Sequence, residues 1–139
     1  MKRKKSGKPG LINIILRNFI SKPATIQYPF QQTVIEKDYR GRHYPDLNKC
    51  TGCSLCKIEC PADAIEMVSI PGEYIVPRIN PRRIYPVINY FRCVYCYRCV
   101  TICPVDAYIT TNDHRLVSEK MINSSEYSLS TISKGGGSE

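Results

Sequence analysis

Two cysteine runs with the same spacing contain every thiol of the chain, eight in all. The first run ends at Pro61 and the second at Pro104, and their members are Cys50, Cys53, Cys56 and Cys60, then Cys93, Cys96, Cys99 and Cys103. Both runs read C-x2-C-x2-C-x3-C-P, a spacing that binds [4Fe–4S] clusters through thiolates. The sequence therefore predicts two [4Fe–4S] clusters, whose chemistry is electron transfer.

The spacing also predicts how the cysteines divide between the two clusters. Two-residue gaps let one tight loop bring the first three thiolates of a run to one cluster. The fourth cysteine lies beyond this loop, and the proline after it turns the chain away, so it ligates the other cluster. One cluster then takes Cys50, Cys53, Cys56 and Cys103. The second takes Cys93, Cys96, Cys99 and Cys60, and we expect cluster assembly to be coupled to folding.

Disulfides and zinc are the alternatives for these cysteines. Disulfides need an oxidising compartment, and the N-terminal segment does not resemble a secretory signal peptide, because Asn13 and Arg17 interrupt its apolar run. Four-cysteine zinc sites usually consist of two separated C-x2-C pairs. Thiolates alone accept zinc as well as iron, so it is the doubled pattern that favours iron–sulfur clusters.

The two runs belong to an internal repeat with an offset of 43 residues, since Cys50 answers Cys93 and residues 61–64 answer residues 104–107. Each half predicts a loop and a short helix, followed by an extended stretch at residues 65–70 or 108–111. We expect an α+β, two-cluster bacterial ferredoxin-like fold for residues 44–111. Frequent prolines exclude a long helix between the halves, where Ile75, Val76, Ile84 and Val87 could form short edge strands.

The positive charge of the chain is concentrated at its N-terminus. The net charge is +8, and residues 1–22 contain no acidic residue while carrying Lys2, Arg3, Lys4, Lys5, Lys8, Arg17 and Lys22. The apolar run Leu11 to Ile20 that follows is too short to span a bilayer, which takes about 20 apolar residues. A basic flank beside an amphipathic helix instead indicates peripheral contact with a membrane or a membrane protein. Docking on the chain's own core is the alternative.

These features divide the chain into four parts. Residues 1–22 are a basic arm with an amphipathic, membrane-proximal helix, and residues 23–43 are an extended connecting segment. The ferredoxin-like domain occupies residues 44–111. Residues 112–139 form a C-terminal extension, and its polar, Ser- and Gly-rich end predicts an extended or disordered tail.

Segments outside the cysteine runs add a more specific resemblance. RNF at residues 17–19, TIQYP at 25–29 and YRGRH at 39–43, followed by the two cysteine runs, resemble the NuoI-type (TYKY) subunit of respiratory complex I. The resemblance extends over about residues 11–120. Related subunits occur in F420H2 dehydrogenases and membrane-bound hydrogenases, which are alternative assignments.

The resemblance implies an electron-transfer subunit of a membrane-bound quinone oxidoreductase. Its clusters would pass electrons to a terminal cluster in a neighbouring subunit, with Leu11 to Ile20 near the membrane subunit that forms the quinone chamber. The expected location is the cytoplasmic face of the cell membrane, bound peripherally. The resemblance also places Arg40, Arg42 and His43 at an interface near the terminal cluster or the quinone site. We favour a simpler interpretation, in which the arginines bind partner carboxylates and His43 caps a turn.

Two other function classes remain at this stage. A soluble, diffusible ferredoxin is one, although such a carrier rarely needs a basic apolar helix. A nucleic-acid-associated iron–sulfur protein is the other, suggested only by the basic residues 2–5. We expect no nucleic-acid partner, because the charge outside residues 1–22 is close to balanced.

Overall fold

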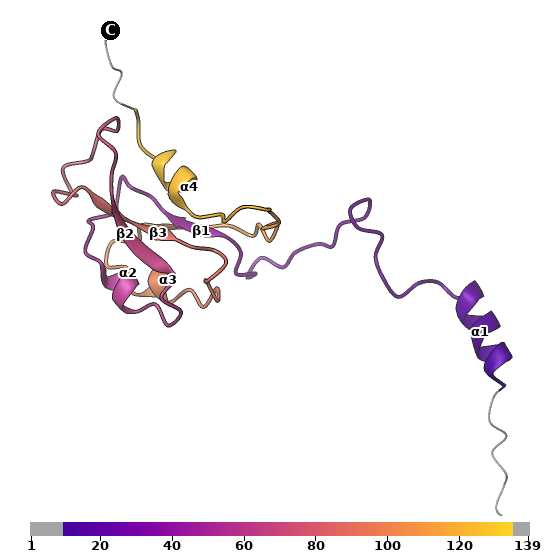
Figure 1. Cartoon of the computed structure of the whole chain (residues 1–139). Helices are drawn as coiled ribbons and strands as arrows, with labels where there is room; N and C mark the ends of the chain where they lie inside the picture. The colour runs from indigo at the N-terminus through magenta and orange to yellow at the C-terminus, as the bar shows by residue number, and fades with distance from the viewer. Residues whose placement is uncertain (1–9, 135–139) are drawn as a thin grey trace, which may run out of the picture. The chain divides into compact units, whose positions relative to one another are not determined.

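The computed structural model describes residues 10–134, and it forms two units that divide after Val34. The N-terminal unit contains the helix α1, Leu11–Ile20, drawn in indigo in Figure 1. The helix follows Gly10 and ends shortly before Pro23, which cannot donate a helical hydrogen bond. The predicted helix is therefore present, while the basic residues 2–8 lie outside the described part of the chain.

One face of α1 is apolar. Helical spacing of about 3.6 residues per turn places on it Leu11, Ile12, Ile15, Leu16, Phe19 and Ile20. Within this unit the Phe19 side chain is 88 % exposed and Ile20 is 84 % exposed. Over residues 10–134, no helix combines the length and the apolar character that crossing a membrane requires.

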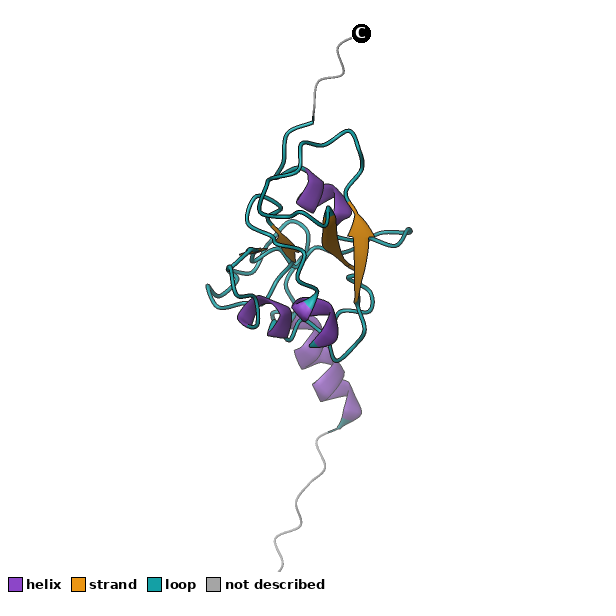
Figure 2. Ribbon diagram, turned by 90° about the vertical axis from the view of Figure 1, so that its left-hand side faces the viewer, coloured by secondary structure: helices purple, strands orange, loops and turns teal. Residues whose placement is uncertain are grey.

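The second unit, which begins at Ile35, has the expected α+β character. Its elements in chain order are β1 (His43–Pro45), α2 (Leu55–Ile58), β2 (Ile65–Ser69), β3 (Ile84–Ile88), α3 (Arg98–Thr101), β4 (Tyr108–Thr110) and α4 (Ser125–Leu129). The strands form two antiparallel pairs, β1 with β4 and β2 with β3. The short helices α2 and α3 lie together on one side of the strands, and α4 lies on the other (Figure 1 and Figure 2).

The internal repeat of the sequence reappears in the backbone. The helices α2 and α3 start 43 residues apart, as do the strands β2 and β4. Each helix is preceded by a residue in the left-handed conformation, Ser54 at φ 69° and Tyr97 at φ 62°. Asp63 and Asp106, which are also 43 residues apart, share a φ of 46°. Equal spacing has therefore produced the same loop twice.

Two hydrophobic clusters form the core between these halves. The first is centred on Leu47, Tyr85 and Ala107, and the second on Ile65, Ile88 and Tyr90. Cysteines belong to both clusters, with Cys50 in the first and Cys56 and Cys99 in the second. Because this hydrophobic core is small, the loops that carry the cysteines contribute a large part of its packing.

The strands differ in part from those expected. The extended stretches after each cysteine run are confirmed as β2 and β4, and Ile84 and Val87 lie in β3. Residues 75 and 76 form no strand; the single bridge in that region joins Tyr74 to Lys134. The strand β1 was not predicted, because three residues that include Pro45 give too short a pattern to detect.

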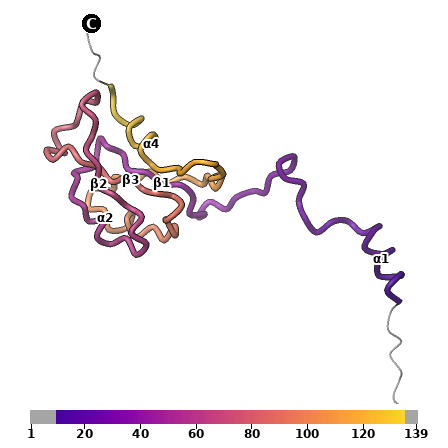
Figure 3. The backbone as a smooth tube through the Cα atoms, viewed as in Figure 1, coloured from indigo at the N-terminus to yellow at the C-terminus, as the bar shows by residue number. Residues whose placement is uncertain are grey.

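The C-terminal extension also differs from the sequence prediction. Residues 123–134 are folded rather than extended: they form α4 and return along the strands β1 and β3 (Figure 3). Ser124 and Ser128 are completely buried, and Ile132 belongs to the first core cluster. Polar composition does not exclude a folded segment here, because hydrogen bonds satisfy the hydroxyl groups of the buried serines. Residues 135–139 lie outside the described part of the chain.

Ser124 makes the central contact of this segment. Removing its hydroxyl tests whether residues 123–134 are folded against the strands. The backbone N–H of Ile88 in β3 donates to Ser124 Oγ at 2.9 Å, and both residues are fully buried. Ser124→Ala would leave that N–H without a partner, which costs about 1–3 kcal/mol. We expect the visible iron–sulfur absorbance of the full chain to bleach faster in denaturant. Ser130→Ala, at an exposed hydroxyl on the same segment, is the matched control and should bleach at the wild-type rate.

Candidate functional site

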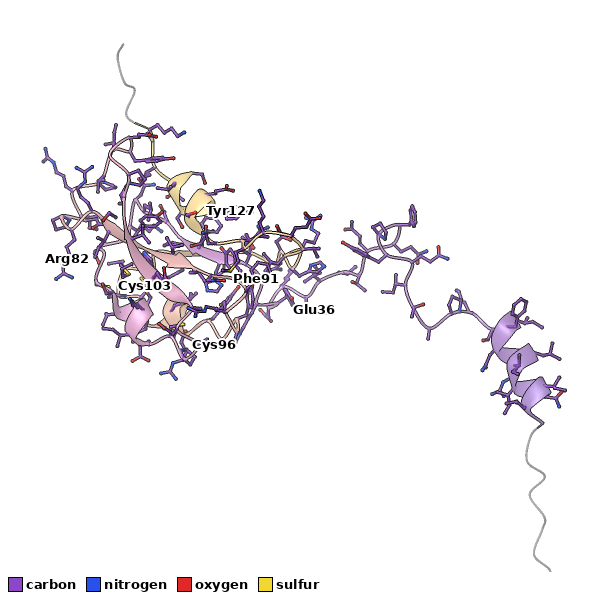
Figure 4. All side chains as sticks on the ribbon, in the orientation of Figure 1. Glu36, Arg82, Phe91, Cys96, Cys103 and Tyr127 are labelled. Atoms are coloured by element: carbon purple, nitrogen blue, oxygen red, sulfur yellow. The ribbon has the colours of Figure 1, made fainter. Side chains whose placement is uncertain are left out.

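The eight thiols gather around two cavities, each lined by cysteines of both runs. The first cavity is lined by Cys50, Cys53, Cys56 and Cys103. The second is lined by Cys60, Cys93, Cys96 and Cys99. Including their openings to solvent, the cavities enclose about 360 and 320 Å³, so they are similar in size. Figure 4 labels Cys103 and Cys96, one thiol from each cavity.

The loop between the first and third cysteines of each run wraps one side of its cavity. In the first run, left-handed backbone at Gly52 and Ser54 turns the chain around the cavity. Gly52 is required by space as well as by its φ of +66°, since a Cβ atom there would lie 2.9 Å from the Ile84 carbonyl oxygen. In the second run Tyr95 and Tyr97 adopt the same conformation with full side chains. The loop geometry is thus kept although only one of the four positions is glycine.

Backbone N–H groups point at the sulfur atoms of both cavities. The N–H of Ala64 donates to Cys60 Sγ at 3.3 Å, and the N–H of Ala107 donates to Cys103 Sγ at 3.4 Å. Ala64 and Ala107 are repeat counterparts, so each fourth cysteine receives the same hydrogen bond. Donors of this kind stabilise thiolate ligands and influence the potential of an iron–sulfur cluster.

The protonation equilibria of the buried thiols indicate that the cavities bind a cation. Burial raises the pKa of Cys50, Cys56 and Cys93, and it raises the pKa of Cys99 to about 12. A buried thiol therefore stays neutral unless a cation is beside it, and iron supplies that cation while the proton leaves. Two groups of four such soft donors fit two [4Fe–4S] clusters.

The two cavities meet within the second core cluster. Cys56 of the first cavity and Cys99 of the second pack in this cluster with Ile65, Ile88 and Tyr90. Tyr108, which lines the first cavity, is half-buried against this cluster, and its buried hydroxyl lies close to the thiols of both Cys56 and Cys99. The region between the two thiol groups is therefore protein interior and excludes solvent.

His43 lies inside this interior, contrary to both sequence interpretations. Its side chain is 1 % exposed, so it neither caps a surface turn nor reaches a partner subunit. Its Nε2 atom is 3.3 Å from Cys99 Sγ, and its ring lies 4.8 Å from the Tyr97 ring, centroid to centroid. Burial lowers the pKa of His43, which favours the neutral imidazole. The sequence placed His43 one residue before the domain, and nothing in its neighbourhood there signalled contact with Cys99.

The neighbouring arginines also bind within the chain. Arg42 pairs with the Asp113 carboxylate and donates to the Tyr127 hydroxyl, with its guanidinium 4.5 Å from the Tyr127 ring centroid. Arg40 donates to the Cys96 carbonyl oxygen at 3.2 Å. The interpretation of Arg42 as a ligand of partner carboxylates is therefore wrong, since its carboxylate is Asp113 of the C-terminal extension. Arg40 instead contacts the loop of the second cavity.

Comparison with known proteins supports the same cofactor. Residues 49–107 match a family described as a 4Fe-4S dicluster domain. The chain is 33 % identical over 113 residues to NADH-quinone oxidoreductase subunit I 2 of Geobacter metallireducens, covering 78 % of this chain and 83 % of that protein. It is 38 % identical over 76 residues to NADH-quinone oxidoreductase subunit I of Protochlamydia amoebophila, covering 51 % of this chain and 43 % of the relative.

A solved structure matches as well. The membrane-bound sulfane sulfur reductase, an archaeal respiratory membrane complex, contains a chain that is 34 % identical with a TM-score of 0.55. The alignment covers 81 % of the present chain and 56 % of that one. The eight thiols in two cavities, the dicluster match and the extent of the Geobacter alignment agree. The chain belongs to the NADH-quinone oxidoreductase subunit I family and is an electron-transfer subunit with two [4Fe–4S] clusters.

Proposed function

We propose that this chain relays electrons one at a time through its two clusters to a terminal cluster in a neighbouring subunit, within a membrane-bound, complex I-like quinone oxidoreductase. One observation carries the proposal: two thiol-lined cavities share one hydrophobic core cluster through Cys56 and Cys99. Two redox centres held in one rigid interior form consecutive steps of an electron path.

The residues of the chain have supporting roles in this function. The thiolates hold the clusters, the N–H groups of Ala64 and Ala107 stabilise two of the sulfur ligands, and Tyr90 and Ile88 keep water out. The clusters, when bound, accept and release the electrons. We assign no bond-making step on a substrate to any side chain, and the contribution of the protein is ligation, positioning and tuning of potentials.

The ligand sets that we propose follow the lining of the cavities. Cys50, Cys53, Cys56 and Cys103 bind the first cluster. Cys93, Cys96, Cys99 and Cys60 bind the second. Each set takes its fourth thiolate from the other run, and this agrees with the spacing argument from the sequence.

The partners that we propose are the other subunits of the complex, including the subunit with the terminal cluster and the membrane subunit that forms the quinone chamber. Within residues 10–34, the apolar face of α1 is suited to lie on the membrane arm. This supports a peripheral position at the cytoplasmic face of the membrane, with residues 1–22 as the attachment and residues 44–111 as the cluster domain.

A second candidate differs only in the final acceptor. The structural match is to a membrane-bound sulfane sulfur reductase, so the same kind of subunit serves an archaeal respiratory complex of that name. F420H2 dehydrogenases and membrane-bound hydrogenases are further alternatives of this class, and a diffusible ferredoxin is the alternative outside it. Purifying the native assembly from membranes, identifying its subunits and assaying quinone reduction separates these candidates.

The crossed ligand sets predict the outcome of two cysteine substitutions. Cys60→Ala removes a thiolate from the second cavity, although Cys60 belongs to the first run. We expect it to abolish or convert the cluster that is bound by Cys93, Cys96 and Cys99. Cys103→Ala should damage the cluster bound by Cys50, Cys53 and Cys56. Electron paramagnetic resonance of the reduced variants, with iron and sulfide analysis, distinguishes the two clusters.

Substitutions of a first-position cysteine provide the reference spectra for this test. Cys50→Ala and Cys93→Ala each remove a ligand whose cluster is the same under crossed or local ligation. The Cys60→Ala spectrum should therefore resemble that of Cys93→Ala. A Cys60→Ala spectrum resembling that of Cys50→Ala would show local ligation and contradict the assignment.

The apolar face of α1 predicts how the subunit attaches. Ile15→Gln together with Phe19→Gln makes the centre of that face polar, and glutamine preserves helix propensity. Each apolar side chain buried on the membrane arm contributes about 1.5–3 kcal/mol. We expect the variant to be washed more readily from membranes, with loss of quinone reduction and retained electron transfer to a soluble acceptor.

The polar face of the same helix supplies the control. Asn13→Gln together with Arg17→Gln changes two side chains of α1 and leaves the apolar face intact. This variant should remain on the membrane with full quinone activity. Equal release of both variants, or of neither, would be inconsistent with an apolar anchor.

A further inference from the structure

The two cluster cavities are related by the repeat, and this relation extends to the strands beside them. In β4, Tyr108 pairs with Pro45 of β1. In β2, the repeat counterpart of Tyr108 is Ile65, which pairs with Ile88 of β3. The strands β1 and β3 therefore occupy equivalent places in the two halves, although their sequences share no motif.

Equivalent positions on these two strands carry different chemistry. Two residues before Pro45 stands His43, and two residues before Ile88 stands Pro86. His43 lines the second cavity, and Pro86 lines the first. A proline side chain can donate no hydrogen bond, whereas an imidazole can. The two clusters therefore lie in unequal surroundings at this position.

The contact between His43 and the second cavity has the geometry of a hydrogen bond to sulfur. Nε2 lies 3.3 Å from Cys99 Sγ, and the histidine is 1 % exposed. A thiolate ligand can only accept, so Nε2 must carry the proton. The other ring nitrogen, Nδ1, is buried and completes no hydrogen bond of normal geometry with the described residues, while the Gly41 backbone lies close enough to the imidazole to oppose the effect of burial on its pKa. Ligation of Cys99 as a thiolate favours the tautomer that carries the proton on Nε2.

We propose that His43 selectively raises the reduction potential of the second cluster by donating this Nε2–H···Sγ hydrogen bond to Cys99. Reduction adds negative charge to the cluster and its thiolates, so the hydrogen bond strengthens in the reduced state and favours it. The inference rests on the proposed ligation of the second cluster by Cys99. His43 acts through the ligand and is therefore a positioning and tuning residue rather than a catalytic one.

Other donors do not reproduce this difference between the cavities. The amides of Ala64 and Ala107 act alike on the two fourth cysteines. The amide of Tyr95 donates to Cys93 Sγ at 3.4 Å, and its repeat counterpart, the amide of Gly52, interacts in the same way with Cys50. Arg98 lines the second cavity, but its guanidinium pairs with Glu59 at 2.7 Å and its side chain is 64 % exposed, so solvent screens its charge. The buried Tyr108 hydroxyl interacts with the Cys56 thiol of the first cavity, so its influence falls on the first cluster and does not account for a shift of the second.

The test compares three variants in the purified complex, with both clusters present. His43→Leu removes the donor. His43→Gln keeps an N–H near the position of Nε2. Tyr90→Phe is the matched control, because the Tyr90 hydroxyl donates to the His43 carbonyl oxygen at 2.9 Å and its loss disturbs the same residue without touching the imidazole.

The readout is a potentiometric titration of each cluster followed by electron paramagnetic resonance, with the signals assigned from the cysteine variants. For His43→Leu we expect the reduction equilibrium of the second cluster to become about tenfold less favourable. Its reduction potential then falls by about 59 mV, the value for a one-electron couple. The first cluster should be unchanged. His43→Gln should recover most of the shift, and Tyr90→Phe should show none.

Several results would overturn the inference. They are an unchanged second cluster in His43→Leu, an equal shift of both clusters, or a glutamine variant indistinguishable from the leucine variant. Absence of two cluster signals in the wild-type complex would instead overturn the proposed function, so the two failures are separable.

A measurement on the wild-type protein covers the case in which His43→Leu fails to assemble. The chain has two histidines. The second, His114, makes an edge-to-face contact with the Tyr39 ring. With ¹⁵N-labelled histidine, pulsed electron paramagnetic resonance of the reduced complex should show two couplings to the second cluster. One comes from the imidazole nitrogen, and the other from its exchangeable proton. No coupling to that cluster would refute the hydrogen bond.

Discussion

Convergence of thiols from both halves of the chain is the constraint on which the rest of the fold depends. Each cavity takes three cysteines from one run and one from the other. The halves must therefore pack face to face, and α2 and α3 contact each other as a result. With only short strands and helices of four or five residues in the described part of this unit, the shared boundary supplies much of the packing that a larger hydrophobic core would provide elsewhere.

Covalent spacing accounts for what could be predicted from the sequence. Three cysteines separated by two residues fix a loop regardless of context, so the loops, the short helices and the strands after them followed from the repeat. The grouping of Cys60 and Cys103 across the halves followed from the same argument. The amphipathic spacing of residues 11–20 likewise predicted α1, because an apolar face recurring every three or four residues is a local signal.

Long-range contacts account for what could not be predicted. His43 lies next to Cys99, 56 positions away, only because β1 pairs with β4. In the sequence, Ser124 is one polar residue of a polar segment, and only the fold places the Ile88 amide against its hydroxyl. Arg42 finds its carboxylate at Asp113 through the same return of the chain. In each case the contacting residue is specified by the tertiary fold, and the residues adjacent in the sequence do not indicate it.

The folded C-terminal segment orders events during synthesis. Ile132 completes the core cluster that contains Cys50, yet it is translated after every cysteine. A nascent chain that has exposed all eight thiols therefore still lacks part of the packing that shields the first cavity. The thiols pass through a stage in which oxidants and stray metal ions can reach them. The hydrophobic packing beside the first cavity is therefore complete only after this segment has been translated.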